Sequence, residues 1–317
     1  GRGYKPAEKD IADRFHAVGP IHPETGLPVA PERFGWTGVF ADEICLQAGA
    51  RNDIVGITAA MMRPVGLGPM HEAYPGRVID VGIAEAEAVA SAAGMAYEGA
   101  HPVVALYATF LNRAFDQLLM DVALHKAGVT LVLDRAGVTG ADGASHNGVW
   151  DIAMCSLIPG LRLAAPRDED TLRTELREAL DVDTAPTVLR YRKGSLPEPM
   201  PALHTVGAVD VLLDEACADS SVKLLIVGAG ACAPDAIEAG KRLARDGISV
   251  TVVDPRWLLP ISRDLTQMAS TYDAVITVED GIVHGGFGWA LREALVGSGI
   301  PVRCLGVPQV FPEHGDR

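Results

Sequence analysis

Runs of apolar residues alternate with amphipathic stretches along most of the chain, and this pattern predicts alternating strands and helices. Unbroken apolar runs such as VVAL and VTLVL are typical of strands that are covered on both faces. Helices are predicted at Thr37–Ala48 and at the alanine-rich segment Ala84–Tyr97. Strands are predicted at Asp53–Thr58, Arg77–Val81, Pro102–Leu106, Val129–Leu133, Arg162–Ala165 and Thr187–Arg190. Alternation of this kind predicts an α/β fold with a parallel, doubly wound sheet.

The pattern divides the chain into two doubly wound domains. Residues 1–34 lack sustained periodicity and are interpreted as an extended arm or linker, and residues 35–195 as the parallel-sheet domain. The proline-rich stretch SLPEPMPAL marks a linker at 196–205, and a smaller α/β domain is predicted at 206–317. Its predicted strands are Lys223–Val227, Ser249–Asp254, Ala274–Glu279 and Val302–Leu305, separated by helices at Pro234–Asp246 and Gly286–Val296.

Composition excludes some classes of function. The 317 residues carry a formal net charge of −14, with a pI near 5.0, which argues against binding to nucleic acid or to an anionic membrane. One or two local cations would still suffice for a phosphorylated small molecule. The five cysteines are scattered singly, which favours a reduced, cytoplasmic protein with no zinc site. No apolar run is long enough to span a bilayer, and the start of the chain does not resemble a signal peptide.

Two glycine-rich turns offer one functional alternative. VGAGACA (Val227–Ala233) follows a strand and opens a helix, and Asp254 ends the next strand, as in a dinucleotide-binding fingerprint. GGFGWA (Gly285–Ala290) is a turn of the same kind. Small residues are also favoured in any tight turn that packs against a sheet, and the unit is only about half the size of a complete dinucleotide domain. NAD binding is therefore a minor alternative.

The segment DVGIAEAEAVASAAGMA (Asp80–Ala96) places Glu85 in the first turn of a helix that follows a strand. A carboxylate there can stabilise the helix dipole by under about 1 kcal/mol, and periodicity alone favours this structural role. Glu87 lies two positions further on and is expected to point away from Glu85. The pattern alone leaves a functional role for Glu85 open.

Aromatic and charged residues follow the next strand. In LYATFLNRAFDQ (Leu106–Gln117), Tyr107 and Phe110 lie just past the strand, and helical spacing places Phe110 on one face with Arg113. The structural alternative is a core aromatic residue beside a surface ion pair of Arg113 with Asp116.

Two further segments leave strand ends with polar residues. LDRAGVTGADGASHNG (Leu133–Gly148) is a glycine-punctuated loop that holds Arg135, Asp142 and His146. LRYRKGS (Leu189–Ser195) ends its strand with three cations, which suit a phosphate or a carboxylate. Long polar loops at the carboxyl ends of parallel strands are the usual place for a site in such folds.

Together these segments closely resemble the 1-deoxy-D-xylulose-5-phosphate synthases, whose wider relatives are transketolases and pyruvate-dehydrogenase-type enzymes. IAE before an alanine-rich helix, YATFLNRAFDQ, DRAGVTGADGASHNG and DPRWLLP (Asp254–Pro260) carry the resemblance. It runs almost continuously from GRGY at the start to GVPQVFPEHG near the end. The resemblance implies a pyrimidine-binding domain followed by a transketolase C-terminal-type domain.

The resemblance also implies a thiamine diphosphate cofactor. Glu85 would hydrogen-bond to N1′ of the aminopyrimidine and favour its imino tautomer, a role that suits a buried carboxylate. Phe110 would stack on the pyrimidine ring or flank it, and Ile83 would lie beside the cofactor. The implied reaction is the decarboxylative condensation of pyruvate with glyceraldehyde 3-phosphate, in the supply of isoprenoid precursors.

Substrate-binding roles are implied for residues on the neighbouring strands. Arg113 and Lys193 would hold the acceptor phosphate, with Arg135 as a helper, and Tyr107 would line the same pocket. The remaining implied roles, binding acceptor hydroxyls or moving protons, fall to Asp142 and His146.

The family's first domain, which holds the diphosphate and Mg²⁺ through a GDG…N motif, has no counterpart in this sequence. The chain is therefore expected to be a fragment, a nicked product or one subunit of a split enzyme. No metal ligand is predicted on it. A partner domain or subunit, in a homodimer or a heterotetramer, would complete the enzyme.

Two departures from the family pattern bear on the substrate. Family members usually read IAEQHA, whereas this chain has Ala86 and Glu87 in place of Gln and His. Lys193 stands where many members have Arg, so that a point charge replaces a bidentate fork. A specialised paralogue with another aldehyde acceptor, or a non-catalytic partner subunit, are the alternatives.

Overall fold

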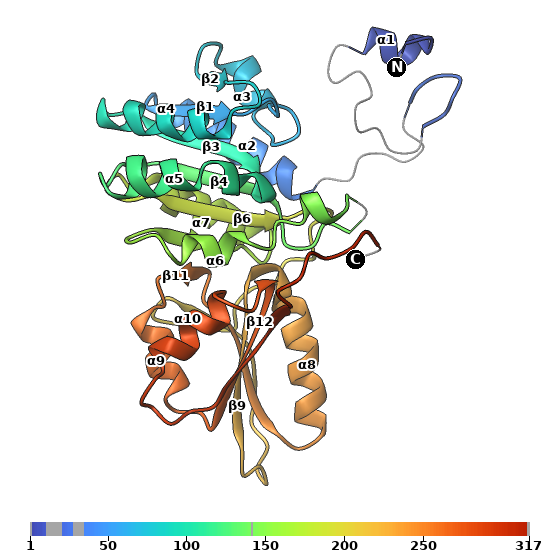
Figure 1. Ribbon diagram of the computed structural model, residues 1–317. Helices are drawn as coiled ribbons and strands as arrows, with labels where there is room; N and C mark the ends of the chain where they lie inside the picture. Colours follow the sequence, from blue (N-terminus) through green and yellow to red (C-terminus); the bar gives the residue numbers. More distant parts are fainter. Residues whose placement is uncertain (1, 11–20, 28–34, 141, 316–317) are drawn as a thin grey trace.

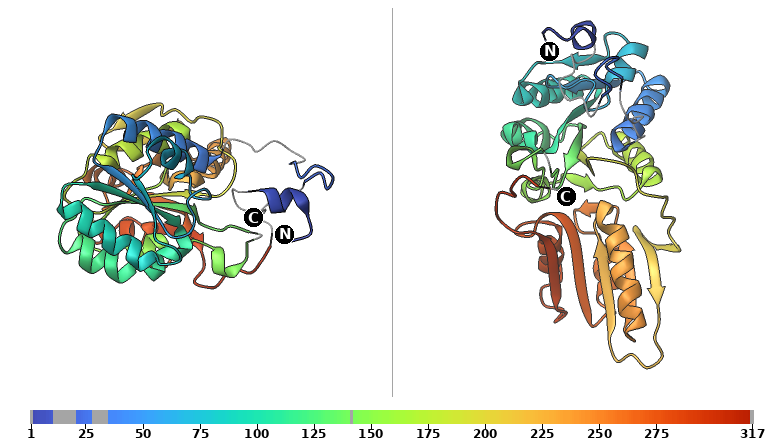
Figure 2. Two further views of the ribbon diagram at one scale, coloured as in Figure 1. Left: turned by 90° about the horizontal axis from the view of Figure 1, so that it is seen from above. Right: turned by 90° about the vertical axis from the view of Figure 1, so that its right-hand side faces the viewer.

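A computed structural model describes residues 2–10, 21–27, 35–140 and 142–315. Figure 1 shows two sheets, one in each of two domains that lie end to end, and a right-angle view in Figure 2 shows the elongated outline. Within the expected arm, the short helix α1 (Lys5–Lys9) stands to the side of the first domain. The remainder of the arm lies partly outside the described residues.

The first sheet is parallel through its six strands β1–β6. They are β1 (Ile54–Thr58), β2 (Val78–Asp80), β3 (His101–Tyr107), β4 (Thr130–Ala136), β5 (Arg162–Ala164) and β6 (Thr187–Arg192). Their order across the sheet is β5-β6-β4-β3-β1-β2. The predicted strands thus form, with ends shifted by at most a few residues. Because the strands run in one direction, their carboxyl ends meet along a single edge.

Helices cover both faces of this sheet. One face carries α2 (Trp36–Ala50), α3 (Gly68–Ala73) and α7 (Glu169–Leu180). The other carries α4 (Glu85–Tyr97), the 3₁₀ helix η1 (Ala108–Arg113), α5 (Phe115–Gln117), the π-helical turn η2 (Leu118–Ala123) and α6 (Asp151–Cys155). Alternate strand residues serve the two cores: Val103 packs toward α2, whereas Val104 packs toward α4. Burial on both faces explains the unbroken apolar runs.

The second sheet is mixed, with the order β13-β12-β9-β10-β8-β7. Its strands are β7 (His204–Val206), β8 (Val209–Glu215), β9 (Lys223–Gly228), β10 (Ser249–Asp254), β12 (Ala274–Ile282) and β13 (Val302–Val307). Its helices are α8 (Ala233–Arg245), α9 (Arg263–Ala269) and α10 (Phe287–Ala294). The hairpin of β7 and β8 pairs antiparallel with β10 and was not predicted. It turns at Gly207, where φ is +58°, and β7 begins inside the expected linker.

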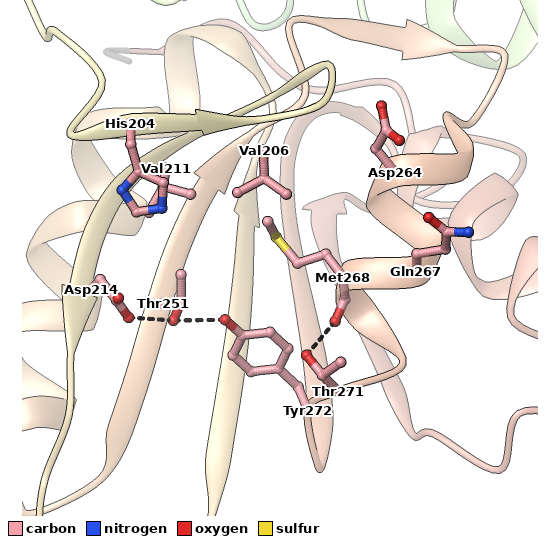
Figure 3. A pocket seen from close by; sticks show the side chains of 10 residues that line it. All are labelled: His204, Val206, Val211, Asp214, Thr251, Asp264, Gln267, Met268, Thr271 and Tyr272. Atoms are coloured by element: carbon pink, nitrogen blue, oxygen red, sulfur yellow. Dashed lines mark hydrogen bonds between the residues drawn. The ribbon is translucent and has the colours of Figure 1, made fainter.

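A polar chain ties the end of α9 to this sheet, as Figure 3 shows. The Tyr272 hydroxyl donates to Thr251 Oγ1 at 2.8 Å, and Thr251 donates to Asp214 Oδ1 at 2.9 Å. These residues line a pocket of about 320 Å³ together with residues of β7 and α9. None of the predicted site residues contributes to its lining.

The two domains share one core. Strand β11 (Trp257–Leu259) belongs to the second half of the chain but pairs antiparallel with β5 at the edge of the first sheet. A single hydrophobic cluster runs from Leu131 of β4 to Leu225 of β9 and Phe287 of α10. The sequence predicted two separate units. It did not predict that a three-residue strand from the second half of the chain would join the sheet of the first domain, because so short a strand has no hydrophobic pattern of its own.

Buried ion pairs reinforce this junction. Arg167, which precedes α7, contacts Asp210 Oδ2 at 2.7 Å and Asp254 Oδ2 at 3.0 Å in the second domain. Arg190 of β6 contacts Asp151 at 2.6 Å and Asp280 of β12 at 2.5 Å. Removing one partner of such a pair leaves a buried charge uncompensated.

Glu175 of α7 is fully buried near this junction, and neither carboxylate oxygen has a hydrogen-bond partner among the described residues. Burial, reinforced by the charge of Asp254, raises the pKa of Glu175 well above its ordinary value. A raised pKa means that the folded protein keeps a proton that the unfolded chain releases. The contribution of Glu175 to stability is therefore largest below its ordinary pKa and decreases as pH rises.

We expect Glu175→Gln to remove this dependence. Relative to the parent, the variant should gain about 1.4 kcal/mol of unfolding free energy for each pH unit above about 5 in which folded Glu175 stays protonated. Urea denaturation of both proteins at pH 5 to 8 measures the difference. Glu293→Gln, on the exposed side of α10, is the matched control. A constant difference between Glu175→Gln and the parent would show that Glu175 is ionised in the fold.

Candidate functional site

The predicted site residues gather at the carboxyl edge of the first sheet. They follow β2, β3, β4 and β6, which supply neighbouring loops along that edge. Clefts outside the carboxyl ends of parallel strands are where such sheets bind ligands. The strand order therefore brings together segments that are separated by more than 100 residues in the chain.

Glu85 is the first residue of α4 and is only 4% exposed. Its Oε2 lies 3.5 Å from Nη1 of Arg113, the last residue of η1. Arg113 thus pairs with Glu85, and the alternative surface pair with Asp116 does not form. Ile83, two residues before Glu85, has 79% of its surface exposed. The start of α4 presents a sheltered carboxylate beside an exposed apolar side chain.

Glu87 faces away from this group. Its side chain is exposed and accepts a hydrogen bond from Ser91 one turn further along α4, at 2.8 Å. This agrees with the expected direction of the residue and places its charge on the surface of the described chain.

Aromatic rings form a row that includes Phe110, which lies on η1 with Arg113. Tyr107, which ends β3, stacks on Phe110 of η1 with a centroid distance of 6.1 Å and an angle of 12°. His146 meets the edge of Phe110 at 5.9 Å. On the other side, the Arg135 guanidinium lies 3.9 Å from the Tyr107 ring centre. Such stacked and edge-on contacts fix ring orientation.

The loop that carries His146 is held by two polar contacts. Thr109 of η1 donates to the Ser145 carbonyl at 2.9 Å. The Asn147 side chain accepts from the backbone N–H of Thr139 at 2.8 Å, which closes the loop on itself. Thr109 and Asn147 were not singled out from the sequence, because a polar residue in a loop carries no distinctive pattern.

Two of the three cations at the end of β6 have different partners. Lys193 reaches the loop and contacts both carboxylate oxygens of Asp142 at 2.7 Å. Arg190 instead is 3% exposed and is committed to the domain junction. The prediction that all three cations of LRYRKGS are available to a phosphate is therefore wrong for Arg190.

A pocket of about 760 Å³ opens next to this group. It is lined by the start of α2, by Arg63, Gly66 and Pro69, and by Asp134, Arg135 and Lys193 to Ser195. Asp134 is 1% exposed and accepts a hydrogen bond from Thr37 Oγ1 at 2.6 Å. Burial raises the pKa of Asp134 to about 6, and burial also raises the pKa of Tyr107. Neither Asp134 nor Thr37 was predicted, although an aspartate at the end of a buried strand was a usable signal.

The glycine-rich turns serve packing. A Cβ on Gly230 would lie 2.6 Å from the Ala165 carbonyl oxygen of the first domain. Asp254 is fully buried and paired with Arg167, so it cannot present its carboxylate to a ribose. At the second turn, Glu279 accepts from the backbone N–H groups of Phe287 and Gly288 and occupies the helix start. The NAD-binding alternative is therefore wrong for both turns.

Residues 32–199 match the transketolase pyrimidine-binding domain, which is more than half of the chain. The chain belongs to the transketolase family. Residues 218–317 match the transketolase C-terminal domain. The expected α/β fold with two domains of these types is thereby confirmed.

Curated relatives in this family are longer than the chain. It is 55% identical over 321 aligned residues to 1-deoxy-D-xylulose-5-phosphate synthase 2 of Kitasatospora griseola, covering 100% of this chain and 51% of the relative. It is 56% identical to the 1-deoxy-D-xylulose-5-phosphate synthase of Clavibacter sepedonicus, with 100% and 49% covered. The chain thus spans about half the length of the curated relatives it matches.

A solved structure described as a split gene transketolase, inactive beta4 tetramer, shares the architecture. The TM-score is 0.75 at 28% identity, and the match covers 87% of this chain and 89% of the other. The solved chain is comparable in extent to this one.

The site of this transketolase-family chain suits one end of a thiamine cofactor. A sheltered carboxylate and an aromatic row are the groups that an aminopyrimidine ring requires, since the ring needs an acidic partner for a nitrogen and a flat apolar contact. Within the described ranges, no group of three or more His, Cys, Asp or Glu side chains is arranged to hold a metal ion. No helix in the same ranges is long and apolar enough to cross a membrane.

Proposed function

We propose that this chain is the pyrimidine-binding half of a thiamine-diphosphate-dependent transferase. The complete enzyme would condense pyruvate with glyceraldehyde 3-phosphate to 1-deoxy-D-xylulose 5-phosphate, with loss of CO₂. The observation that carries the proposal is the sheltered Glu85 at the start of α4, paired with Arg113 of η1, the same 3₁₀ helix that supplies Phe110 to the aromatic row. Identity of more than half to synthases of that name, over the whole chain, supports it.

In this proposal the chain's own residues hold the pyrimidine and its proton. Thiamine diphosphate, when bound, supplies a nucleophilic carbon that accepts the acyl unit of a 2-oxo acid. Glu85 shares a proton with a pyrimidine nitrogen, and its burial keeps water from competing for that proton. Phe110 orients the ring, and Ile83 covers an edge of it. Arg113, 3.5 Å from Glu85, keeps the carboxylate directed toward the site.

The acceptor would bind at the neighbouring strand ends. Arg113, Lys193 and Arg135 would hold its phosphate, and Tyr107 would line the pocket. Asp142 and His146 would bind acceptor hydroxyls or move a proton. Lys193 contacts Asp142 in this structure, so an incoming phosphate would share Lys193 with that carboxylate.

The proposal extends to what completes the enzyme. A diphosphate-binding domain or subunit would carry the Mg²⁺ ligands, and the assembly would be a homodimer or a heterotetramer in the cytoplasm, supplying isoprenoid precursors. We also propose that residues 1–34 and 196–205 are linkers between functional units at 35–195 and 206–317. The tetrameric split transketolase supports the idea of such a subunit.

The test combines the chain with the matching diphosphate-binding domain, thiamine diphosphate, Mg²⁺, pyruvate and glyceraldehyde 3-phosphate. We expect CO₂ release together with 1-deoxy-D-xylulose 5-phosphate. CO₂ release without this product would favour a paralogue with another acceptor, which Glu87 in place of the usual histidine motivates. No CO₂ release with any aldehyde would leave only a non-catalytic partner role.

Lys193→Gln, measured in the same assay, tests whether Lys193 binds the phosphate of the acceptor. Loss of one charged contact to a phosphate removes about 1.5–3 kcal/mol of binding, so KM for glyceraldehyde 3-phosphate should rise roughly 10- to 100-fold. KM for pyruvate should change little, because pyruvate has no phosphate. Lys241→Gln, exposed on α8, is the matched control. An unchanged KM for the aldehyde phosphate would remove Lys193 from the substrate pocket.

A further inference from the structure

Asp134 is a charged residue that the proposed reaction does not use. It is the fifth residue of β4, lies at the carboxyl edge of the sheet and is 1% exposed. One carboxylate oxygen accepts from the Thr37 hydroxyl, in the first turn of α2, at 2.6 Å. The other lies 3.5 Å from Nη1 of Arg135. A buried carboxylate is expensive unless it is paired, so these contacts require an explanation.

Arg135 is held in a strained conformation directly beside it. Its φ is +59°, in the left-handed region that residues other than glycine rarely adopt. Such strain persists only where the surroundings enforce it, and it is common at functional sites. Three contacts hold its side chain here: the ion pair with Asp134, the Tyr107 ring beneath the guanidinium, and a hydrogen bond that Nη1 donates to the Pro64 carbonyl at 3.5 Å. The Arg135 side chain lines the pocket and is 22% exposed.

The pocket holds more positive than negative charge at its wall. Arg63, Arg135 and Lys193 line it together with the start of α2, and Asp134 is the carboxylate in the same lining. Outside the lining, Glu72 contacts Arg63 at 2.9 Å and Asp142 contacts Lys193 at 2.7 Å. A helix start and several cations together favour an anion. Asp134 opposes that preference in two ways: it repels a bound anion, and it competes with the anion for Arg135.

We propose that Asp134 is a positioning residue that sets how strongly this pocket holds a phosphate group, through its grip on Arg135. When the carboxylate is charged, Arg135 is engaged and the pocket is weakly attractive. When the carboxylate takes up a proton, Arg135 is released to the anion and one opposing charge disappears. Phosphate binding and proton uptake by Asp134 are therefore coupled. That the phosphate belongs to an aldehyde substrate rests on the proposed function. The coupling between anion binding and proton uptake does not.

The groups around Asp134 are compatible with this coupling. Burial raises its pKa to about 6, while the charges of Arg135 and Lys193 and the Thr37 hydrogen bond act in the opposite direction. Other charged or titratable neighbours are Arg63 of the pocket wall, Tyr107 of β3, Tyr191 of β6 and Asp142, which pairs with Lys193. Burial raises the pKa of both tyrosines, so they stay neutral.

The experiment measures sulfate binding to the chain by calorimetry between pH 5 and 8. Sulfate keeps both charges throughout this range, whereas phosphate itself titrates within it. The removal of one like charge at several ångströms should tighten sulfate binding on the order of tenfold from pH 7.5 to pH 5. Inorganic phosphate should compete with sulfate. A sulfate affinity that does not change with pH, or the absence of sulfate binding, would overturn the proposal.

Two variants separate this role from simple structural support. Asp134→Asn keeps an acceptor for Thr37 but carries no charge, so its sulfate affinity should be high and nearly independent of pH. Thr37→Val removes a hydrogen bond that lowers the pKa of Asp134, so the midpoint of the profile should move to higher pH. A merely structural Asp134 would give a weakened but still pH-dependent Asp134→Asn profile, and an unmoved midpoint in Thr37→Val, and would exclude the proposal.

His71→Gln is the control for another titration. Histidine side chains also gain charge in this range, and His71 is exposed on α3, the helix whose Pro69 lines the pocket. The variant should retain the parent's profile, and loss of the profile would assign it to His71 and contradict the role of Asp134. No cofactor or partner domain enters these measurements. Failure of the condensation assay would thus leave the coupling standing, and failure here would leave the condensation standing.

Discussion

Replacement of Glu85 by glutamine is expected to abolish measurable condensation when the chain is combined with its diphosphate-binding partner. The side chain keeps its size and its hydrogen-bonding capacity but can no longer hold or release a proton. A positioned proton-transfer group contributes about 10²- to 10⁴-fold to a rate, so turnover should fall by at least about 10²-fold. The second readout is hydrogen–deuterium exchange at the reactive carbon of thiamine diphosphate, which should slow by a similar factor.

The surroundings of Glu85 explain why Glu85→Gln should lower the reaction rate without lowering the stability of the fold. Its carboxylate is 4% exposed, and Arg113 approaches it to 3.5 Å. Arg113 is 56% exposed, so water can solvate its guanidinium when a neutral amide replaces the carboxylate. Thermal unfolding of Glu85→Gln should therefore stay close to that of the parent.

Glu98→Gln is the matched control for this prediction. Glu98 caps the other end of α4 and is exposed, so its variant should keep both turnover and exchange. Exchange in Glu85→Gln at the rate of the parent would refute the assigned role, whatever happens to turnover. Slow exchange in both variants would instead indicate that α4 as a whole had been disturbed.

Much of the first sheet was predictable because its signal is local. Strands buried on both faces are continuous apolar runs, so segments such as Val129–Leu133 can be recognised as strands from the sequence alone. The direction of those strands then places their following loops on one edge. For this reason His146, in the loop after β4, could be expected near Tyr107 and Phe110 at the end of β3 before any contact was known.

Antiparallel additions were not predictable by the same reasoning. Strand β8 (Val209–Glu215) carries a buried aspartate near its start and ends in two exposed acidic residues, and β11 is only three residues long. Both owe their conformation to partners far away in the sequence: β8 pairs with β10, and β11 pairs with β5 across the domain boundary. A short strand has no periodicity of its own, so tertiary pairing decides it.

Charged residues were the hardest to assign. Lys193 and Arg190 lie three positions apart in one run of cations, yet the first contacts Asp142 of the candidate site and the second two buried aspartates. Strand alternation does not separate them, because Lys193 follows the end of β6. Asp134 was overlooked for a related reason, since its neighbour Arg135 drew the functional interpretation.

Arg190 is the residue whose loss should destabilise the fold most among those discussed. Its side chain is 3% exposed and joins Asp151, which is fully buried, to Asp280 of the second domain. Arg190→Met keeps a similar volume but leaves both carboxylates without this cation. Breaking one side of a buried ion pair costs about 3–5 kcal/mol, and we expect a loss of that size in the free energy of unfolding. Urea denaturation at pH 7.5 measures it, and Arg242→Met, exposed on α8, should change stability by less than about 0.5 kcal/mol.

The pH dependence and a double variant identify the cause of that loss. Burial already raises the pKa of Asp151, and without Arg190 the carboxyl would rather take up a proton than remain charged. The deficit of Arg190→Met should therefore shrink as pH falls from 7.5 to 5. Asp151→Asn combined with Arg190→Met should lose less stability than the two single variants added together, because the uncompensated charge is gone. Strictly additive losses, equal at both pH values, would mean that packing and not charge holds this junction, and the ion pair would then contribute nothing specific to the coupling of the two domains.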